Sequence, residues 1–95
     1  MAKFEINTYS DADEIIKTFT RNTCPVHLFT RAVKLAEKQE QKKASEYEVI
    51  DEIIEIVKTL FPEMTQEDVE KCDMTDIIFT FRQLVTKASG IESKN

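Results

Sequence analysis

The residue types best suited to covalent chemistry are two cysteines and one histidine. Cys24 and His27 flank Pro25 closely, and Cys72 lies far from them in the sequence. A thiolate beside an imidazole can act as a nucleophile. Such a site also needs a residue that orients the imidazole and donors that stabilise an oxyanion, and no Gly-rich turn or third residue of this kind is recognisable. We therefore expect no catalytic residues, and a protein that is not an enzyme.

The same side chains offer little to a metal ion or a cofactor. His27 would need companions at ligand spacing, and Cys24 is the only nearby candidate. The chain has no Gly-rich phosphate loop, no CxxC, no EF-hand loop and no HExxH. We expect no metal, no cofactor and two reduced, partly buried thiols, while a disulfide between Cys24 and Cys72 stays open because spacing says nothing about proximity.

Composition bounds the elements that would hold these side chains. The chain has 95 residues, of which 33% are charged and 41% hydrophobic, so we expect one folded domain over residues 1–95. One glycine and two prolines are too few for a turn-rich β-sandwich or barrel. The composition therefore predicts an all-α protein, a small bundle of four to five helices with a short N-terminal strand or arm.

The net charge argues against nucleic-acid binding, and the hydropathy argues against a membrane-spanning segment. The formal net charge is −5, whereas non-specific binding to phosphates needs several unpaired lysines and arginines. No run approaches the roughly 18 apolar residues of a membrane span, and the first ten residues lack the apolar segment of a signal peptide. Residues 15–43 carry seven basic and two acidic side chains, and residues 46–76 carry eleven acidic and two basic. These are either two solvated helix faces that attract each other or a patch that orients a partner.

The N-terminal third is expected to hold an arm and two helices. Residues 3–9 alternate in polarity and predict a strand within an arm over 1–9, which is an extended segment, an edge that pairs with another subunit, or a disordered end. Ser10 and Asp13 have capping-box spacing and predict a first helix. Pro25 suits the first turn of a second helix. The first helix would bury Ile15, Ile16 and Phe19, and the second Val26, Phe29, Ala32, Val33 and Ala36, with residues 37–43 as an exposed helical extension or a flexible connection.

Three further helix starts follow. Ser45 with Glu48 is the clearest capping box and opens a helix that ends near Phe61. Its main apolar stripe holds Tyr47, Ile50, Ile53, Ile54, Val57, Leu60 and Phe61, and Val49 and Ile56 fall beside that stripe. The wide apolar arc suits a helix that is contacted from two sides. Thr65 with Asp68 predicts a short helix over 66–71. Asp73 predicts the start of a last helix that runs to about Ala88. Gly90 would stop this helix, and residues 89–95 would form a frayed tail.

One aromatic residue does not fit the core pattern. Phe79 is one position out of register with the stripe that contains Ile78, Phe81 and Val85. It either packs on a neighbouring helix or is exposed. An exposed phenylalanine on an acidic helical protein would mark a partner-binding site.

The C-terminal half carries a resemblance to a known family. Its residues are Phe61, Met64-Thr65, Glu67-Asp68-Val69, Cys72-Asp73 and Asp76-Ile77, and residues 25–37 match a second block of a proline followed by an amphipathic helix with a basic residue. This pattern resembles the tail assembly chaperones of long-tailed bacteriophages from Gram-positive hosts, over roughly residues 20–88. Cys72 departs from the valine or leucine expected there, and the N-terminal strand is outside the resemblance.

The resemblance implies a non-enzymatic chaperone that binds and solubilises the tape measure protein during tail morphogenesis and helps to recruit the tail tube protein. It also implies self-association, for which the Phe4–Thr8 arm is a donor of subunit contacts. The chaperone would act in the cytoplasm of the infected or lysogenic bacterial host and be absent from the mature virion. Such proteins are often made in a short form and a longer, frameshifted form.

A helix-binding chaperone needs an exposed apolar stripe or groove. We expect the partner-binding residues to be Val49 and Ile56, beside the main stripe, together with Phe61 and Phe79. The alternative is a small acidic helical adaptor, a regulatory protein that binds a compact protein partner through its acidic face.

Overall fold

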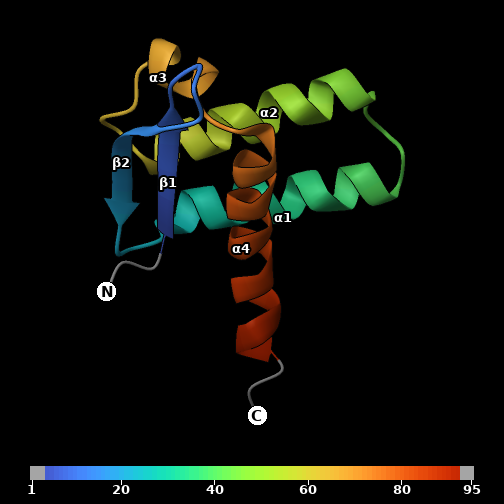
Figure 1. Ribbon diagram of the computed structural model, residues 1–95. Coiled ribbons are helices and arrows are strands. Elements are labelled where there is room, and N and C mark those ends of the chain that lie inside the picture. The colour runs from blue at the N-terminus through green and yellow to red at the C-terminus, as the bar shows by residue number, and fades with distance from the viewer. Residues whose placement is uncertain (1–3, 93–95) are drawn as a thin grey trace.

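The chain begins with a β-hairpin, so the prediction of an all-α fold is wrong. The computed structural model describes the backbone of residues 4–92 and the side chains of residues 4–86. Strands β1 (Phe4–Tyr9) and β2 (Ile15–Arg21) pair antiparallel and precede the helices, which gives an α+β fold (Figure 1). The helices are α1 (Val26–Glu40), α2 (Glu46–Leu60), α3 (Gln66–Glu70) and α4 (Met74–Glu92).

The predicted first helix is strand β2 because Ser10 closes a hairpin loop instead of capping a helix. Its Oγ accepts hydrogen bonds from the backbone N–H groups of Ala12 and Glu14, each at 3.2 Å. Short side chains of this kind stabilise turns and helix starts by the same backbone contacts. Asp13 lies in the left-handed region with φ 65°, which lets the loop turn without a glycine. The β-branched side chains that dominate β2 then favour a strand.

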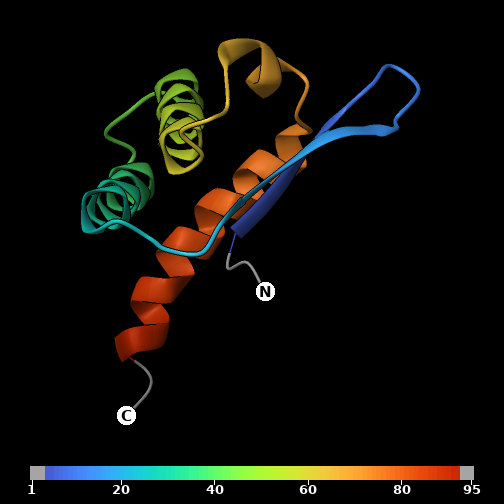
Figure 2. The same ribbon diagram turned by 90° about the vertical axis from the view of Figure 1, so that its left-hand side faces the viewer.

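The strand predicted at the N-terminus exists as β1, and its partner lies in the same chain. The register runs from Phe4 opposite Arg21 to Thr8 opposite Lys17, with an irregularity where Tyr9 faces Ile15. The inward side chains of β1 are buried, and the strand runs alongside α4 (Figure 2). The arm is therefore neither an unpaired extension nor a strand that waits for another subunit. Residues 1–3 of the predicted arm lie outside the described residues.

Pro25 is the N-cap of α1, one position before the first turn in which it was predicted, and the buried face of α1 shares only Ala32 with the predicted face. Its buried side chains are Leu28, Ala32 and Leu35, whereas Val26 is 78% exposed. The helix continues to Glu40, so the polar segment after Ala36 is an exposed helical extension. It ends in a turn where the Lys43 N–H donates to the Lys38 carbonyl at 3.0 Å and Lys42 takes a left-handed φ of 57°.

Both predicted capping boxes that follow are confirmed. Ser45 and Glu48 exchange side-chain-to-backbone hydrogen bonds at the start of α2, and Thr65 and Asp68 do the same for α3. The buried face of α2 differs from the predicted apolar stripe. The helix buries Val49, Ile53, Ile56, Val57 and Leu60, so the two residues placed beside the stripe lie within the core, and Tyr47 is 78% exposed.

Helix α4 begins after Asp73 as predicted and continues past Gly90 to Glu92. Gly90 therefore does not stop the helix, and residues 89–92 are helical, while residues 93–95 lie outside the described part of the chain. The helix packs against α1, α2 and β1 and crosses the α1–α2 pair (Figures 1 and 2). Its buried Ile77, Phe81 and Leu84 join one hydrophobic cluster that also contains Phe4 and Ile6 of the hairpin. No described helix has both the length and the apolar character needed to cross a membrane.

Candidate partner-binding surface

The residues best suited to covalent chemistry take structural positions. His27 is exposed on α1, Cys24 packs partly buried against the core before that helix begins, and Cys72 does so between α3 and α4. Both cysteines are thiols. Burial, together with the nearby carboxylates of Asp68 and Asp76, raises the pKa of the Cys72 thiol to about 11. A thiol of this kind is a weak nucleophile at neutral pH. Within residues 4–92, no cluster of three or more His, Cys, Asp or Glu side chains is placed to hold a metal ion.

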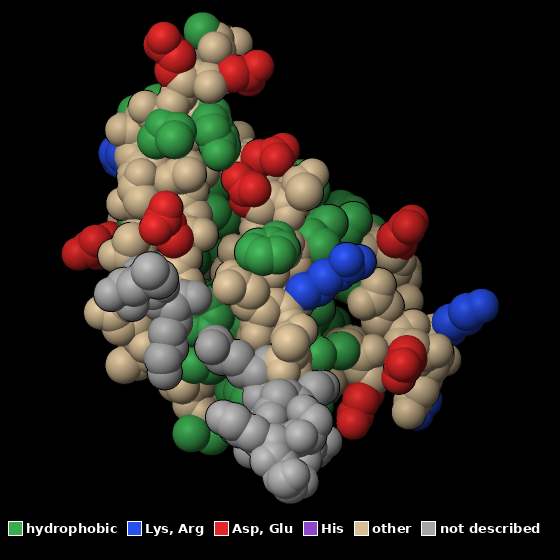
Figure 3. Space-filling model, turned by 60° about the horizontal axis from the view of Figure 1, so that its bottom comes forward, with side chains coloured by type: hydrophobic (Ala, Val, Ile, Leu, Met, Phe, Trp, Pro, Cys, Tyr) green, Lys and Arg blue, Asp and Glu red, His purple; other side chains and the backbone are tan. Residues whose placement is uncertain are grey.

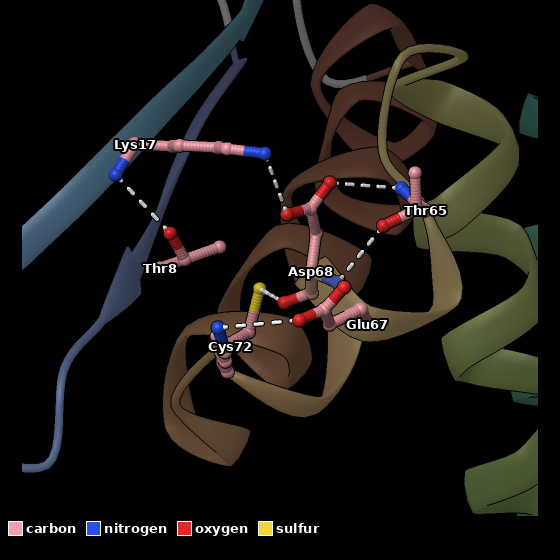
Figure 4. Close-up of polar contacts among 7 residues, drawn as sticks. Thr8, Lys17, Thr65, Glu67, Asp68 and Cys72 are labelled. Carbon is pink, nitrogen blue, oxygen red and sulfur yellow. Dashed lines mark hydrogen bonds and ion pairs between the residues drawn. The ribbon is translucent and has the colours of Figure 1, made fainter.

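Asp68 in α3 makes hydrogen bonds through both its backbone and its carboxylate (Figure 4). One oxygen accepts a hydrogen bond from the Thr65 backbone N–H at 3.0 Å, and the other accepts from Lys17 Nζ at 3.1 Å. The Asp68 backbone N–H donates in turn to Thr65 Oγ1 at 3.1 Å, and its carbonyl accepts from Cys72 Sγ at 3.4 Å. These contacts hold the pKa of the Asp68 carboxyl below its ordinary value, first through the Thr65 N–H and then through Lys17.

The Asp68 contacts attach the hairpin to α3 instead of forming a reactive site. Thr8 forms a β-bridge with Cys72, and the Tyr9 N–H donates to the Lys71 carbonyl at 2.9 Å. At the other end of the hairpin, Arg21 donates to the Leu60 carbonyl at 2.8 Å. The charged groups of β2 therefore serve to dock the sheet on the helices, a role that the sequence patterns did not reveal.

The four predicted partner-binding residues do not share one surface. Ile56 is 0% exposed, Phe61 1% and Val49 4%, so three of them pack within the core. Phe61 lies against Phe19 of the hairpin, with ring centroids 6.4 Å apart. Val49 and Phe61 are about 18 Å apart along the helix at its normal rise. Phe79 is 62% exposed, which answers the question left open by its position in the sequence.

A groove opens between α2 and α4. It has a volume of about 360 Å³. Its apolar lining is Val49, Ile50 and Ile53 of α2, Ile78 and Phe81 of α4, and Ala44 of the α1–α2 turn. Its polar lining is Gln39, Lys42, Glu46 and Arg82. Figure 3 shows hydrophobic side chains in the furrow beside α4, with a basic side chain next to them. Of the predicted residues, only Val49 lines this groove.

Sequence patterns missed the groove because its apolar residues other than Val49 were assigned to the core stripes of their helices. Ile50 is 38% exposed and Ile78 is half-buried, so both reach the groove from the margin of the core. The available signal was the width of the apolar arc on α2, which is broader than one helical neighbour can cover. Arg82 follows Phe79 and Ile78 by one turn on the same helix, which places its charge beside both side chains.

Comparison with known proteins shows the family to which the chain belongs. A family described as phage tail chaperone protein matches residues 1–95 of the chain. The chain belongs to the phage tail chaperone family. The match includes the hairpin, which the resemblance in the C-terminal half did not cover. No curated protein and no solved structure matches the chaperone. A Gram-positive host for the phage stays a prediction.

Membership in this family favours a chaperone in tail assembly over the regulatory adaptor. It also gives a reason for exposed apolar side chains on the surface of the chaperone. A protein that acts on tail proteins must present a surface that they can contact, and the exposed Phe79 of α4 and the groove between α2 and α4 are candidates for such a surface.

Proposed function

We propose that this phage tail chaperone binds the tape measure protein and keeps it soluble during tail morphogenesis. The observation that supports this most directly is the exposure of Phe79, of which 62% remains accessible on α4. An aromatic side chain left in water on a small, highly charged protein is typical of a binding surface. Family membership supplies the process, tail assembly, and the apolar side chain supplies the means of contact.

The shape of the surface agrees with a helical partner. A long helical chain presents apolar side chains at intervals of three and four residues, and a groove between two helices receives such a row. The net charge of −5 would keep complexes dispersed by mutual repulsion. The proposed chaperone has no catalytic step, acts in the host cytoplasm and leaves before the virion is complete. Recruitment of the tail tube protein is part of the same proposal.

Self-association is proposed through β2, since β1 is already occupied. The sheet has two strands, and within residues 4–92 β2 pairs only with β1, so its outer edge is open. Backbone groups on an open edge pair with a strand from another copy. Pairing of two such edges would give a dimer, and several dimers would bind along one long partner.

The test is co-expression with the tape measure protein encoded by the same phage. We expect the partner to remain in the soluble fraction and to co-elute with many copies of the chaperone, as measured by size exclusion with light scattering. Phe79→Asp should reduce this complex while leaving the helical content unchanged. Val26→Asp is the matched control, because Val26 is 78% exposed but lies on α1. An insoluble partner beside a chaperone that elutes alone would contradict the proposed function.

A further inference from the structure

The groove between α2 and α4 combines an apolar floor with unpaired positive charge. Val49, Ile53 and Phe81 form its buried floor, at 4–5% exposure. Lys42 and Arg82 lie at its rim, and neither has an ion-pair partner among the described residues. Glu46 is the one acidic residue in the lining, so the groove has an excess of positive charge in a chain whose net charge is −5.

The conformation of Lys42 adds to this argument. The residue occupies the left-handed position after α1, with φ 57°, where glycine is the usual choice because it has no Cβ to clash. A lysine here makes the turn less stable than a glycine would. The side chain is therefore not explained by the turn itself, whereas a cation beside the groove is explained by a negatively charged occupant.

We propose that the groove binds an acidic amphipathic helix of a tail protein, with apolar side chains on its floor and carboxylates near Lys42 and Arg82. This deepens the proposed function by assigning a charge to the bound segment, and it rests on that function for the identity of the partner. An apolar floor does not suit a free small anion, and two cations on an acidic protein are too few for nucleic acid. The apolar anchors would supply most of the affinity and the two cations the selectivity.

Two fluorescein-labelled designed helical peptides test the charge preference. They share the same apolar positions and differ only in having Glu or Lys at the flanking positions. Fluorescence anisotropy should show that the Glu peptide binds roughly tenfold tighter, because two surface ion pairs together contribute about that factor. Added salt should reduce the difference. Equal affinity for the two peptides, or no binding of either, would overturn the proposal.

Charge reversal then locates the preference. The double variant Lys42→Glu with Arg82→Glu should invert the order of the two peptides. The matched control is Lys34→Glu with Lys38→Glu, which makes the same change in net charge in a separate cleft between α1 and α2 and should leave the order unchanged. A control that inverts the order as strongly as the groove variant would overturn the proposal, because the selectivity would then follow total charge.

Lys42→Gly separates binding from folding. We expect this variant to melt at a higher temperature than the parent protein, because glycine relieves the left-handed position, and yet to bind the Glu peptide more weakly. Undiminished binding would remove Lys42 from the proposal.

Co-expression distinguishes this inference from the proposed function. If the charge-reversed groove still keeps the tape measure protein soluble, the groove assignment fails alone; if the parent protein fails to do so while the peptide preference holds, the proposed function fails alone.

Discussion

Lys17 Nζ of β2 donates a hydrogen bond to Asp68 Oδ1 of α3 at 3.1 Å. This contact joins the hairpin to a helix that lies 51 residues later in the sequence. The contact is asymmetric, since 56% of the Lys17 side chain is exposed and only 8% of the Asp68 side chain. The carboxylate also closes the capping box of α3, so one buried group stabilises a helix start and a contact between elements. This double use couples the start of α3 to the position of the hairpin through one carboxylate.

The free energy of unfolding should decrease at acid pH because Asp68 becomes protonated. The carboxyl pKa is lower in the folded protein than its ordinary value of 3.8, so its stabilising contribution is complete above 3.8. It is lost as the pH falls from that value through the lower folded pKa, because the folded state then has to bind a proton that the unfolded state already holds. Thermal unfolding by circular dichroism over a pH series that spans 3.8 should show this decline. Asp68→Asn should melt at a lower temperature at neutral pH and show a flatter acid limb; parallel limbs would exclude Asp68 as the cause.

Ser45 should account for a measurable part of the stability of α2. Its Oγ accepts from the Glu48 N–H at 3.2 Å, and the Glu48 side chain accepts from the Ser45 N–H at 2.9 Å. Ser45→Ala removes the first bond and should cost about 1 kcal/mol, or several degrees in melting temperature for a domain of this size. Ser45→Gly is the control, with an expected loss of a few tenths of a kcal/mol. Equal losses for the two variants would indicate that the cap is not responsible.

Ile56 should behave as a core residue and not as a contact for a partner. It is 0% exposed, so Ile56→Ala leaves a cavity and should lower the free energy of unfolding by about 2–5 kcal/mol. Ile50→Ala is the matched comparison on the same helix, because Ile50 is 38% exposed and its truncation should cost roughly 1 kcal/mol or less. Urea titrations of both variants measure the two losses. A small loss for Ile56 would show that the core is packed differently.

Cys72 should react slowly with thiol reagents. A rise of its pKa from 9.0 to about 11 lowers the thiolate fraction near neutral pH by about a hundredfold, and the thiolate is the reactive form. Alkylation of the Cys24→Ser variant, in which Cys72 is the remaining thiol, should therefore be slow when folded and fast in urea. The folded rate should keep rising with pH toward 11. A folded rate equal to the unfolded rate would show that the thiol is not shielded.

The helix starts could be predicted from the sequence because capping is local. Ser45 with Glu48 and Thr65 with Asp68 satisfy backbone groups within a few residues, so their spacing carries the information. The same spacing at Ser10 and Asp13 misled the prediction, since a hydroxyl accepts from nearby N–H groups in a turn as well. The run of β-branched residues in β2 was a signal against a helix that the spacing outweighed.

The exposed apolar residues of the proposed binding surface could be predicted only in part because exposure depends on neighbours far away in the sequence. Phe79 stood out since its register differs from the apolar stripe of its own helix. Val49 and Ile56 stood out for the same reason, yet they are buried because α1 and α4 cover that side of α2. A wide apolar arc shows that two sides of a helix are contacted, but the covered side follows from tertiary packing. The cations at the rim come from the α1–α2 turn and from α4, which no local pattern connects.

The packing of β1 against α4 has a consequence for biosynthesis. Strand β1 is translated first and α4 last among the described elements, and Phe4 and Ile6 of β1 pack in one cluster with Ile77, Phe81 and Leu84 of α4. A contact between distant segments forms late in folding, since the intervening chain must first be brought together. The hairpin is therefore synthesised before the helix that packs against β1, and the apolar side chains of β1 lack that contact until α4 has been translated. A chain that is truncated before α4 would expose the apolar side chains that pack on this helix, and we expect it to aggregate where the full chain folds.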